Sequence, residues 1–127
     1  MASKKFIPRF TLSEFTEVSD TFTPIIYERC FLMIQYLSYL REKINAPIRI
    51  TSYYRNTEHN KRIGGVSTSL HLKGFAVDFQ TDALQSNVIT ELKKLPYCEI
   101  IVYDNFYHFA IPNPYKTIQT LLDNRTL

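Results

Sequence analysis

The middle of the chain reads Ser52-Tyr-Tyr-Arg55-Asn-Thr-Glu-His-Asn60-Lys-Arg-Ile-Gly-Gly65-Val-Ser-Thr-Ser69-Leu-His71-Leu-Lys-Gly74-Phe-Ala-Val-Asp78. This segment holds all three glycines of the protein and two of its three histidines. Its last part, from Gly74 onward, alternates small or apolar residues in the manner of a buried strand, and Gly74 allows the preceding loop to turn tightly into that strand. The pattern predicts that the loop folds His71 back over the strand end, beside Asp78.

A third histidine lies in the aromatic run Phe106-Tyr-His108-Phe-Ala-Ile111, which also reads as a strand. Imidazole nitrogen and carboxylate oxygen both bind zinc, and a catalytic zinc takes three protein ligands with a fourth position open to water. His71, Asp78 and His108 would supply that number. Read from the residues alone, the pattern also fits a chance spacing, with His108 as a hydrogen-bonded core residue.

The segment resembles the family of zinc D-Ala-D-Ala carboxypeptidases and L,D-endopeptidases. The matching positions are Ser52-Tyr-Tyr-Arg55-Asn56, Asn60, Ile63-Gly64-Gly65, Ser69-Leu-His71-Leu-Lys-Gly74-Phe-Ala76-Val-Asp78 and Phe106-Tyr-His108. The N-terminal run Phe10-Thr-Leu-Ser-Glu-Phe15 is similar to the opening of a branch of the family that is common in phages and their hosts. The resemblance implies a Zn2+ cofactor held by His71, Asp78 and His108, and a fold shared with the hedgehog signalling domain.

The resemblance also implies roles for residues around the metal. The family arginine that matches Arg55 stabilises the oxyanion or binds the substrate carboxylate; a surface ion pair with Glu58 is the alternative role. Ser69 matches a serine that binds the terminal carboxylate of the substrate, although it also suits a turn. Asn105 stands where many members carry a catalytic Glu, and Ala110 where branches often have His, Asp or Ser. Asp104 is the nearest carboxylate for a general base, with turn formation as its alternative role.

The elements expected along the chain form an α+β fold with a small, mostly antiparallel sheet flanked by helices. A capping box of Thr11 and Glu14 predicts a short helix, and a longer helix starts near Pro24 and stops at Asn45-Ala-Pro47. Further predicted elements are a strand over 48–53, a strand over 74–80, a helix from Asp82 to Leu95, a hairpin of strands 99–103 and 107–111, and a helix over 115–123.

Composition limits the classes that the protein can belong to. The length of 127 residues and the hydrophobic content of 45% fit one domain over residues 1–127 with its own core. Cys30 and Cys98 have no metal-ligand spacing and are expected as buried free thiols. The net charge of +3 is too low and too scattered to predict nucleic-acid binding. We expect a monomer without signal peptide or membrane span.

The leading hypothesis is a zinc peptidase that cleaves peptidoglycan stem peptides. Since no secretion signal is recognised, we expect cytoplasmic synthesis and action at the bacterial wall after lysis, in the manner of an endolysin, or as part of a phage particle. The alternative is a module that keeps the zinc and binds wall peptides or a protein partner without efficient cleavage. Asn105 and Ala110 favour this second hypothesis.

Overall fold

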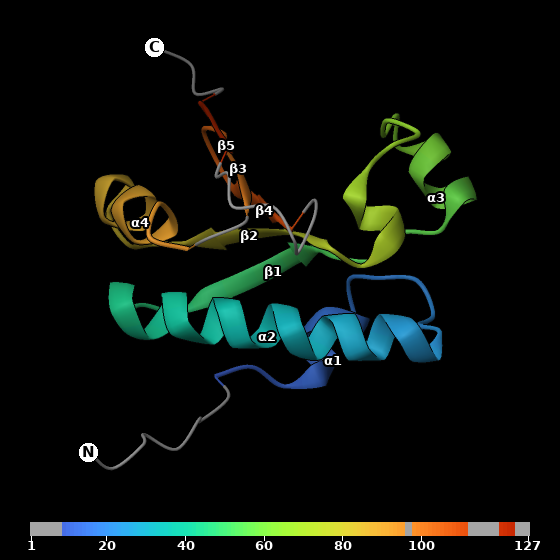
Figure 1. Cartoon of the computed structure of the whole chain (residues 1–127), viewed down its shortest axis with the longest axis horizontal. Helices are drawn as coiled ribbons and strands as arrows, with labels where there is room; N and C mark the ends of the chain where they lie inside the picture. The colour runs from blue at the N-terminus through green and yellow to red at the C-terminus, as the bar shows by residue number, and fades with distance from the viewer. Residues whose placement is uncertain (1–8, 96–97, 112–119, 124–127) are drawn as a thin grey trace.

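The computed structural model describes residues 9–95, 98–111 and 120–123, and its helices surround a twisted sheet of five strands (Figure 1). In chain order the elements are α1 (Leu12–Thr16), α2 (Pro24–Ile44), β1 (Ile48–Ser52), α3 (Thr57–Arg62), the 3₁₀ helix η1 (Leu70–Lys73), β2 (Ala76–Thr81), α4 (Gln85–Leu92), β3 (Glu99–Val102), β4 (Tyr107–Ala110) and β5 (Thr120–Asp123). Figure 1 shows α1 and α2 together below β1, with α3 and α4 at opposite ends of β2.

The sheet has the order β1-β2-β4-β3-β5, and its first three pairings are antiparallel. This confirms the predicted α+β class with a mostly antiparallel sheet. The expected helix over 115–123 is wrong where the structure tests it, because Thr120–Asp123 pairs with β3 as a parallel strand; residues 112–119 lie outside the described ranges. The edge of β3 carries backbone N–H and C=O groups that need hydrogen-bond partners. Hydrogen bonding to this edge outweighs the helix propensity of residues 120–123.

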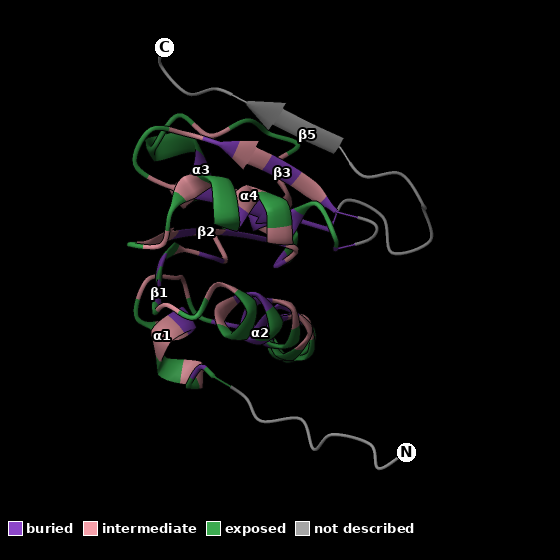
Figure 2. Cartoon of the chain, turned by 90° about the vertical axis from the view of Figure 1, so that its left-hand side faces the viewer, coloured by how far each residue is buried: buried purple, intermediate pink, exposed green. Residues whose placement is uncertain are grey.

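The long helix α2 begins and ends as the sequence predicts. Pro24 occupies the first turn, and Asn45 closes the helix in the left-handed conformation with φ of 52°. One side of the helix is buried, at Ile26, Cys30, Met33, Leu37 and Leu40. In Figure 2 exposed residues colour the outer side of α2, whereas much of the sheet is buried. The helix therefore supplies one side of the core.

The two faces of the sheet have different environments because side chains alternate along each strand. Val77 and Phe79 of β2 and Phe109 of β4 are fully buried, and the ring of Phe109 lies 5.6 Å from that of Tyr36 on α2. Asp78 and His108 project from the opposite face and are only partly buried. The alternation therefore keeps polar groups out of the core and places them together on one surface.

Several local expectations differ from the structure. Thr11 precedes α1, but its hydroxyl bonds that of Ser13 at 2.9 Å and caps no backbone N–H, so the capping box does not form. α4 begins at Gln85 after Leu84, and Asp82 does not cap it. The segment between β1 and β2, for which no helix was predicted, contains α3 and η1, and the side chains of Asn56 and Ser69 each accept from one N–H of the first turn.

The expectation for the two cysteines is confirmed. Cys30 and Cys98 are buried free thiols, and burial raises the pKa of Cys30 to about 12. Within the described ranges, no helix combines the length and apolar character that a membrane span requires.

Candidate metal centre

The loop before β2 brings His71 to the polar face of the sheet. Ser69 caps η1, with its hydroxyl oxygen accepting from the His71 N–H at 3.3 Å. Gly74 then reverses the chain with φ of 73°, where a Cβ would lie 3.0 Å from both Ile26 Cδ1 and the Tyr53 hydroxyl. Only glycine adopts this positive φ without strain and leaves room for the two neighbouring side chains. The predicted tight turn is therefore present, and it directs His71 over the start of β2.

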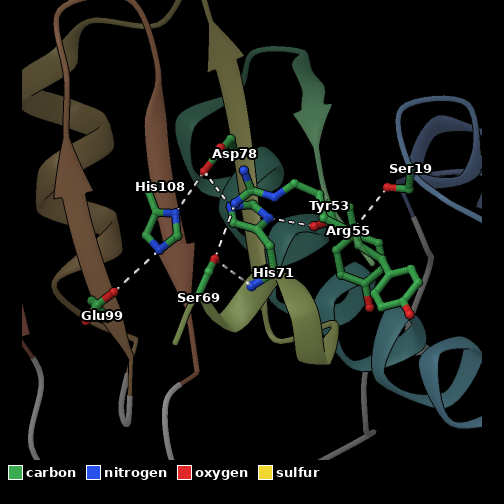
Figure 3. A network of polar contacts seen from close by, with 9 residues as sticks. Ser19, Tyr53, Arg55, Ser69, His71, Asp78, Glu99 and His108 are labelled. Carbon is green, nitrogen blue, oxygen red and sulfur yellow. Dashed lines mark hydrogen bonds and ion pairs between the residues drawn. The ribbon is translucent and has the colours of Figure 1, made fainter. Parts of the chain in front are cut away.

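Cross-strand pairing brings the other two candidate ligands together. Asp78 of β2 lies directly opposite His108 of β4 in the sheet register. His108 Nδ1 lies 2.8 Å from Asp78 Oδ1, and His71 Nε2 lies 3.3 Å from the same oxygen (Figure 3). All three side chains therefore aim one ligand atom at a common point.

The geometry of this group fits zinc. The ligand atoms of His71, Asp78 and His108 all lie within 4.8 Å of one another. Zinc bonds of about 2.0–2.1 Å place neighbouring tetrahedral donors about 3.4 Å apart, so small side-chain rotations suffice to close around an ion. Two imidazoles and one carboxylate are also a donor set that zinc accepts in catalytic sites. These residues can thus hold the metal that the sequence predicts.

The electrostatics of Asp78 favour its ionised form. Burial alone raises the pKa of this carboxyl, but hydrogen bonds from His108 and His71 and the charges of both rings outweigh burial and lower the pKa to about 2. The carboxylate is therefore ionised at neutral pH, as a metal ligand must be.

His71 is fixed from its far side by the core. Its side chain is buried, and Nδ1 lies 2.5 Å from the backbone carbonyl oxygen of Tyr53. The Tyr53 hydroxyl donates to the Gly74 carbonyl at 2.8 Å, so one residue contacts the ring of His71 and the turn that follows it. With Nδ1–H donating to a carbonyl, Nε2 is the ring nitrogen left available to a metal.

A cavity of about 420 Å³ opens beside the three candidate ligands. Its walls also include Arg55 and Ser69 from the loop and Glu99, Ile101, Tyr103 and Phe106 from the β3–β4 hairpin. A smaller pocket of about 240 Å³ between Arg9 and Pro47 contains none of the candidate ligands. The larger cavity is therefore the place where a substrate can reach a metal.

Arg55 lines this cavity in a fixed position. Its N–H donates to the His71 carbonyl at 3.1 Å, and its Nη2 donates to the Ser69 hydroxyl at 3.3 Å. Its buried Nε has no hydrogen-bond partner, and among the described residues no ion pair joins Arg55 to Glu58. Burial lowers the pKa of Arg55 while the charge of Asp78 raises it. The guanidinium therefore lies at the cavity wall next to the charge of Asp78.

Asp104 does not join this group. It is exposed in the turn between β3 and β4, next to the exposed Asn105, and it does not line the cavity. Its assignment as a base stays a prediction. The remaining histidine, His59 of α3, is partly buried away from the cavity, and its Nδ1 lies 3.0 Å from Asp20 Oδ2.

Asn60 and Gly65 have a structural role that the sequence did not reveal. Asn60 is buried, its Nδ2 donates to the Val66 carbonyl at 2.8 Å, and its own carbonyl accepts from the Gly65 N–H at 2.8 Å. A Cβ on Gly65 would lie 2.1 Å from Asn60 Oδ1. These two motif residues therefore shape the loop that carries Ser69 and His71.

Sequence reasoning missed the hairpin wall of the cavity. Glu99 contacts His108 Nε2 at 3.4 Å, and the rings of Tyr103 and Phe106 stack 4.3 Å apart. The register of the predicted hairpin contains the necessary signal, because Glu99 lies opposite Ala110, two residues from His108. Residues related in this diagonal way share a face of the sheet.

A His-Asp-His group in the wall of an open cavity, beside a guanidinium, suits metal-dependent hydrolysis. The family model for peptidase M15 matches residues 8–110, and the chain belongs to this family. Zinc dependence is general in that family, in agreement with the donor set described above. No match is found among the curated proteins.

Proposed function

We propose that the protein is a zinc peptidase that hydrolyses a peptide bond in the stem peptides of bacterial peptidoglycan. The observation that carries this proposal is the convergence of His71, Asp78 and His108 at a cavity that also contains Arg55. Family membership supports peptidase activity, and the resemblance of the motifs to wall-active carboxypeptidases and endopeptidases supports the substrate class. Action on the wall after lysis, as an endolysin or from a phage particle, belongs to the same proposal.

The residues of the cavity have complementary tasks in this reaction. When bound, zinc would polarise the scissile carbonyl and make water a nucleophile near neutral pH. Arg55, which lines the cavity, would bind a substrate carboxylate or the developing oxyanion through its guanidinium N–H groups. Ser69, already hydrogen-bonded to Arg55, would orient the same carboxylate. The stacked rings of Tyr103 and Phe106 would provide an apolar wall for the peptide.

Proton transfer is the step for which the site is least well equipped. Asn105 cannot act as a general base, and Asp104 is the substitute that we propose, reached by movement of the hairpin turn. A general base contributes about 10²- to 10⁴-fold to rate. We therefore propose slow, zinc-dependent hydrolysis by the natural chain.

Single-turnover hydrolysis of a purified muropeptide, with and without chelator, tests this function. The natural chain should cleave slowly, Asp104→Asn more slowly still, and Asn105→Glu faster than the natural chain. Asp82→Asn, which changes a carboxylate outside the cavity, is the matched control and should retain the natural rate. Absence of chelator-sensitive cleavage in all four proteins would overturn the peptidase proposal.

The second candidate function is a zinc-containing module that binds wall peptides or a protein partner. Asn105 and Ala110, which replace reactive residues of the family pattern, favour it. Sedimentation of the protein with purified peptidoglycan separates the two functions. Zinc-dependent binding without release of peptide would support the module, whereas release of peptide would support the peptidase.

A further inference from the structure

Glu99 contacts His108 on the side of the ring that faces away from the other two candidate ligands. His108 Nδ1 lies 2.8 Å from Asp78 Oδ1, whereas Nε2 lies 3.4 Å from Glu99 Oε1. The two contacts leave the imidazole in opposite directions, as Figure 3 shows. Among the described basic side chains, His108 is the one within ion-pair distance of Glu99. The contact is thus specific to this histidine.

The sheet determines this placement. Glu99 begins β3 and pairs with Ala110, while Ile101 pairs with His108. Glu99 and His108 are therefore diagonal neighbours on one face, at a separation that a long side chain can bridge. Glu99 is partly exposed at the cavity wall, with 31% of its side chain accessible.

Binding of a metal by His108 settles which nitrogen carries the proton. A ligating nitrogen must present its lone pair, so Nδ1 is deprotonated and the proton lies on Nε2. A carboxylate that accepts this Nε2–H fixes the tautomer and the orientation of the ring and makes the ligand more basic. Glu99 is the group placed to accept it.

His71 has the equivalent arrangement with its ring nitrogens exchanged. Its Nε2 faces Asp78, and its Nδ1 is 2.5 Å from the Tyr53 carbonyl oxygen. Each candidate histidine ligand therefore has one nitrogen toward the metal position and an acceptor beyond the other. The acceptor is a neutral backbone group for His71 and a charged side chain for His108.

From these contacts we infer that Glu99 is a positioning residue of the metal centre: it accepts a hydrogen bond from His108 Nε2 and sets the affinity for zinc. This inference rests on the proposed zinc function. It differs from a general-base role, because Glu99 lies beyond the imidazole from the metal position. Its effect on hydrolysis is exerted through His108 and not by direct contact with the reacting atoms.

The experiment compares zinc dissociation constants, measured by competition with a chromophoric chelator, for the natural chain, Glu99→Ala and Glu99→Gln. Loss of such an outer acceptor costs about 10- to 100-fold in metal affinity, and we expect Glu99→Ala to show this loss. Glu99→Gln keeps an acceptor oxygen of the same reach and should recover most of the affinity. Glu58→Ala, at an exposed site outside the cavity, should bind like the natural chain.

A spectroscopic measurement distinguishes positioning from a general structural effect. With Co2+ in place of zinc, the ligand-field absorption of Glu99→Ala should change, while the melting temperature of its metal-free form should match that of the natural chain.

Unchanged zinc affinity and an unchanged cobalt spectrum in Glu99→Ala would overturn the inference, and a simultaneous collapse of hydrolysis would assign Glu99 to substrate or proton transfer. If the natural chain itself binds no zinc, the proposed function fails rather than this inference alone.

Discussion

The cavity has two walls of different construction. The loop wall, residues 53–74, is held by contacts within one continuous segment, such as those of Asn60 with Val66 and of Arg55 with His71. The hairpin wall, residues 99–110, is held by cross-strand pairing, and its site residues meet only in the folded sheet. The loop wall contains most of the family motif, whereas the hairpin wall contains the departures from it. The position of His71 is thus determined within one continuous segment, whereas Asp78 and His108 come together only through strand pairing.

The largest expected effect comes from removing the ligand of either wall. His71→Ala on the loop wall and His108→Ala on the hairpin wall should each abolish zinc retention, because two remaining ligands cannot hold the ion against water. Elemental analysis after dialysis measures the bound zinc. His59→Ala is the matched control, since His59 pairs with Asp20 away from the cavity and should retain full zinc. Equal zinc in His71→Ala and the natural chain would show that the walls do not share a metal.

Arg55→Lys tests whether the loop wall contributes chemistry as well as shape. Lysine keeps the charge but loses the planar arrangement of donors, so hydrolysis or peptide affinity should fall about 10²-fold, in the range of a lost oxyanion donor. The melting temperature should change little. Arg62→Lys, at an exposed position of α3, should change neither quantity. A large fall in melting temperature with full activity would make Arg55 a structural residue.

Gly65→Ala tests the internal packing of the loop wall. Because the new Cβ would meet buried Asn60, the variant should lose about 1–3 kcal/mol in the free energy of unfolding, as overpacked sites do. Denaturant titration measures the loss. Asn105→Ala, in the exposed turn of the hairpin wall, should stay within about 0.5 kcal/mol. Equal losses in the free energy of unfolding for Gly65→Ala and Asn105→Ala would mean that the two walls tolerate substitution equally well.

The smallest effect concerns the anchor of the loop wall at Asp20. Burial raises the pKa of Asp20, but the Asn56 N–H and His59 outweigh burial and lower the pKa below its ordinary value. This carboxylate therefore stabilises the fold above its unfolded pKa of about 3.9, and the contribution is lost as pH falls through the folded value. Asp20→Asn should melt at a slightly lower temperature than the natural chain at pH 7.

The difference between Asp20→Asn and the natural chain should disappear in acid, at pH values below the folded pKa of Asp20. Thermal melts at both pH values measure it, with Glu17→Gln, at an exposed position nearby, as control. The same difference in melting temperature at both pH values would mean that the changed shape of the side chain, and not the loss of its charge, causes the effect.

The sequence predicted the elements that local signals define. Pro24 and Asn45 bound α2 as expected, and the alternation around Asp78 and His108 identified two strands whose ligands do meet. Predictions from local sequence signals failed where contacts with distant parts of the chain determine the structure. Thr120–Asp123 became a strand because the edge of β3 was available, and α4 starts three residues after Asp82. Glu99 was missed for the same reason, since its neighbour His108 is nine positions away in sequence and adjacent only across the hairpin.

Tyr53 connects the metal centre to the interior of the protein. Its carbonyl faces His71, its hydroxyl bonds Gly74, and its ring packs edge-on against Phe15 and Phe22 at 5.3 and 5.5 Å. Replacement of either phenylalanine during evolution would reorient this tyrosine and, with it, the imidazole of His71. We expect selection to act on these two positions through the stability of the fold and through the proposed metal binding by His71. Lineages that retain the enzyme's metal should change these two rings more slowly than other core residues of the same size.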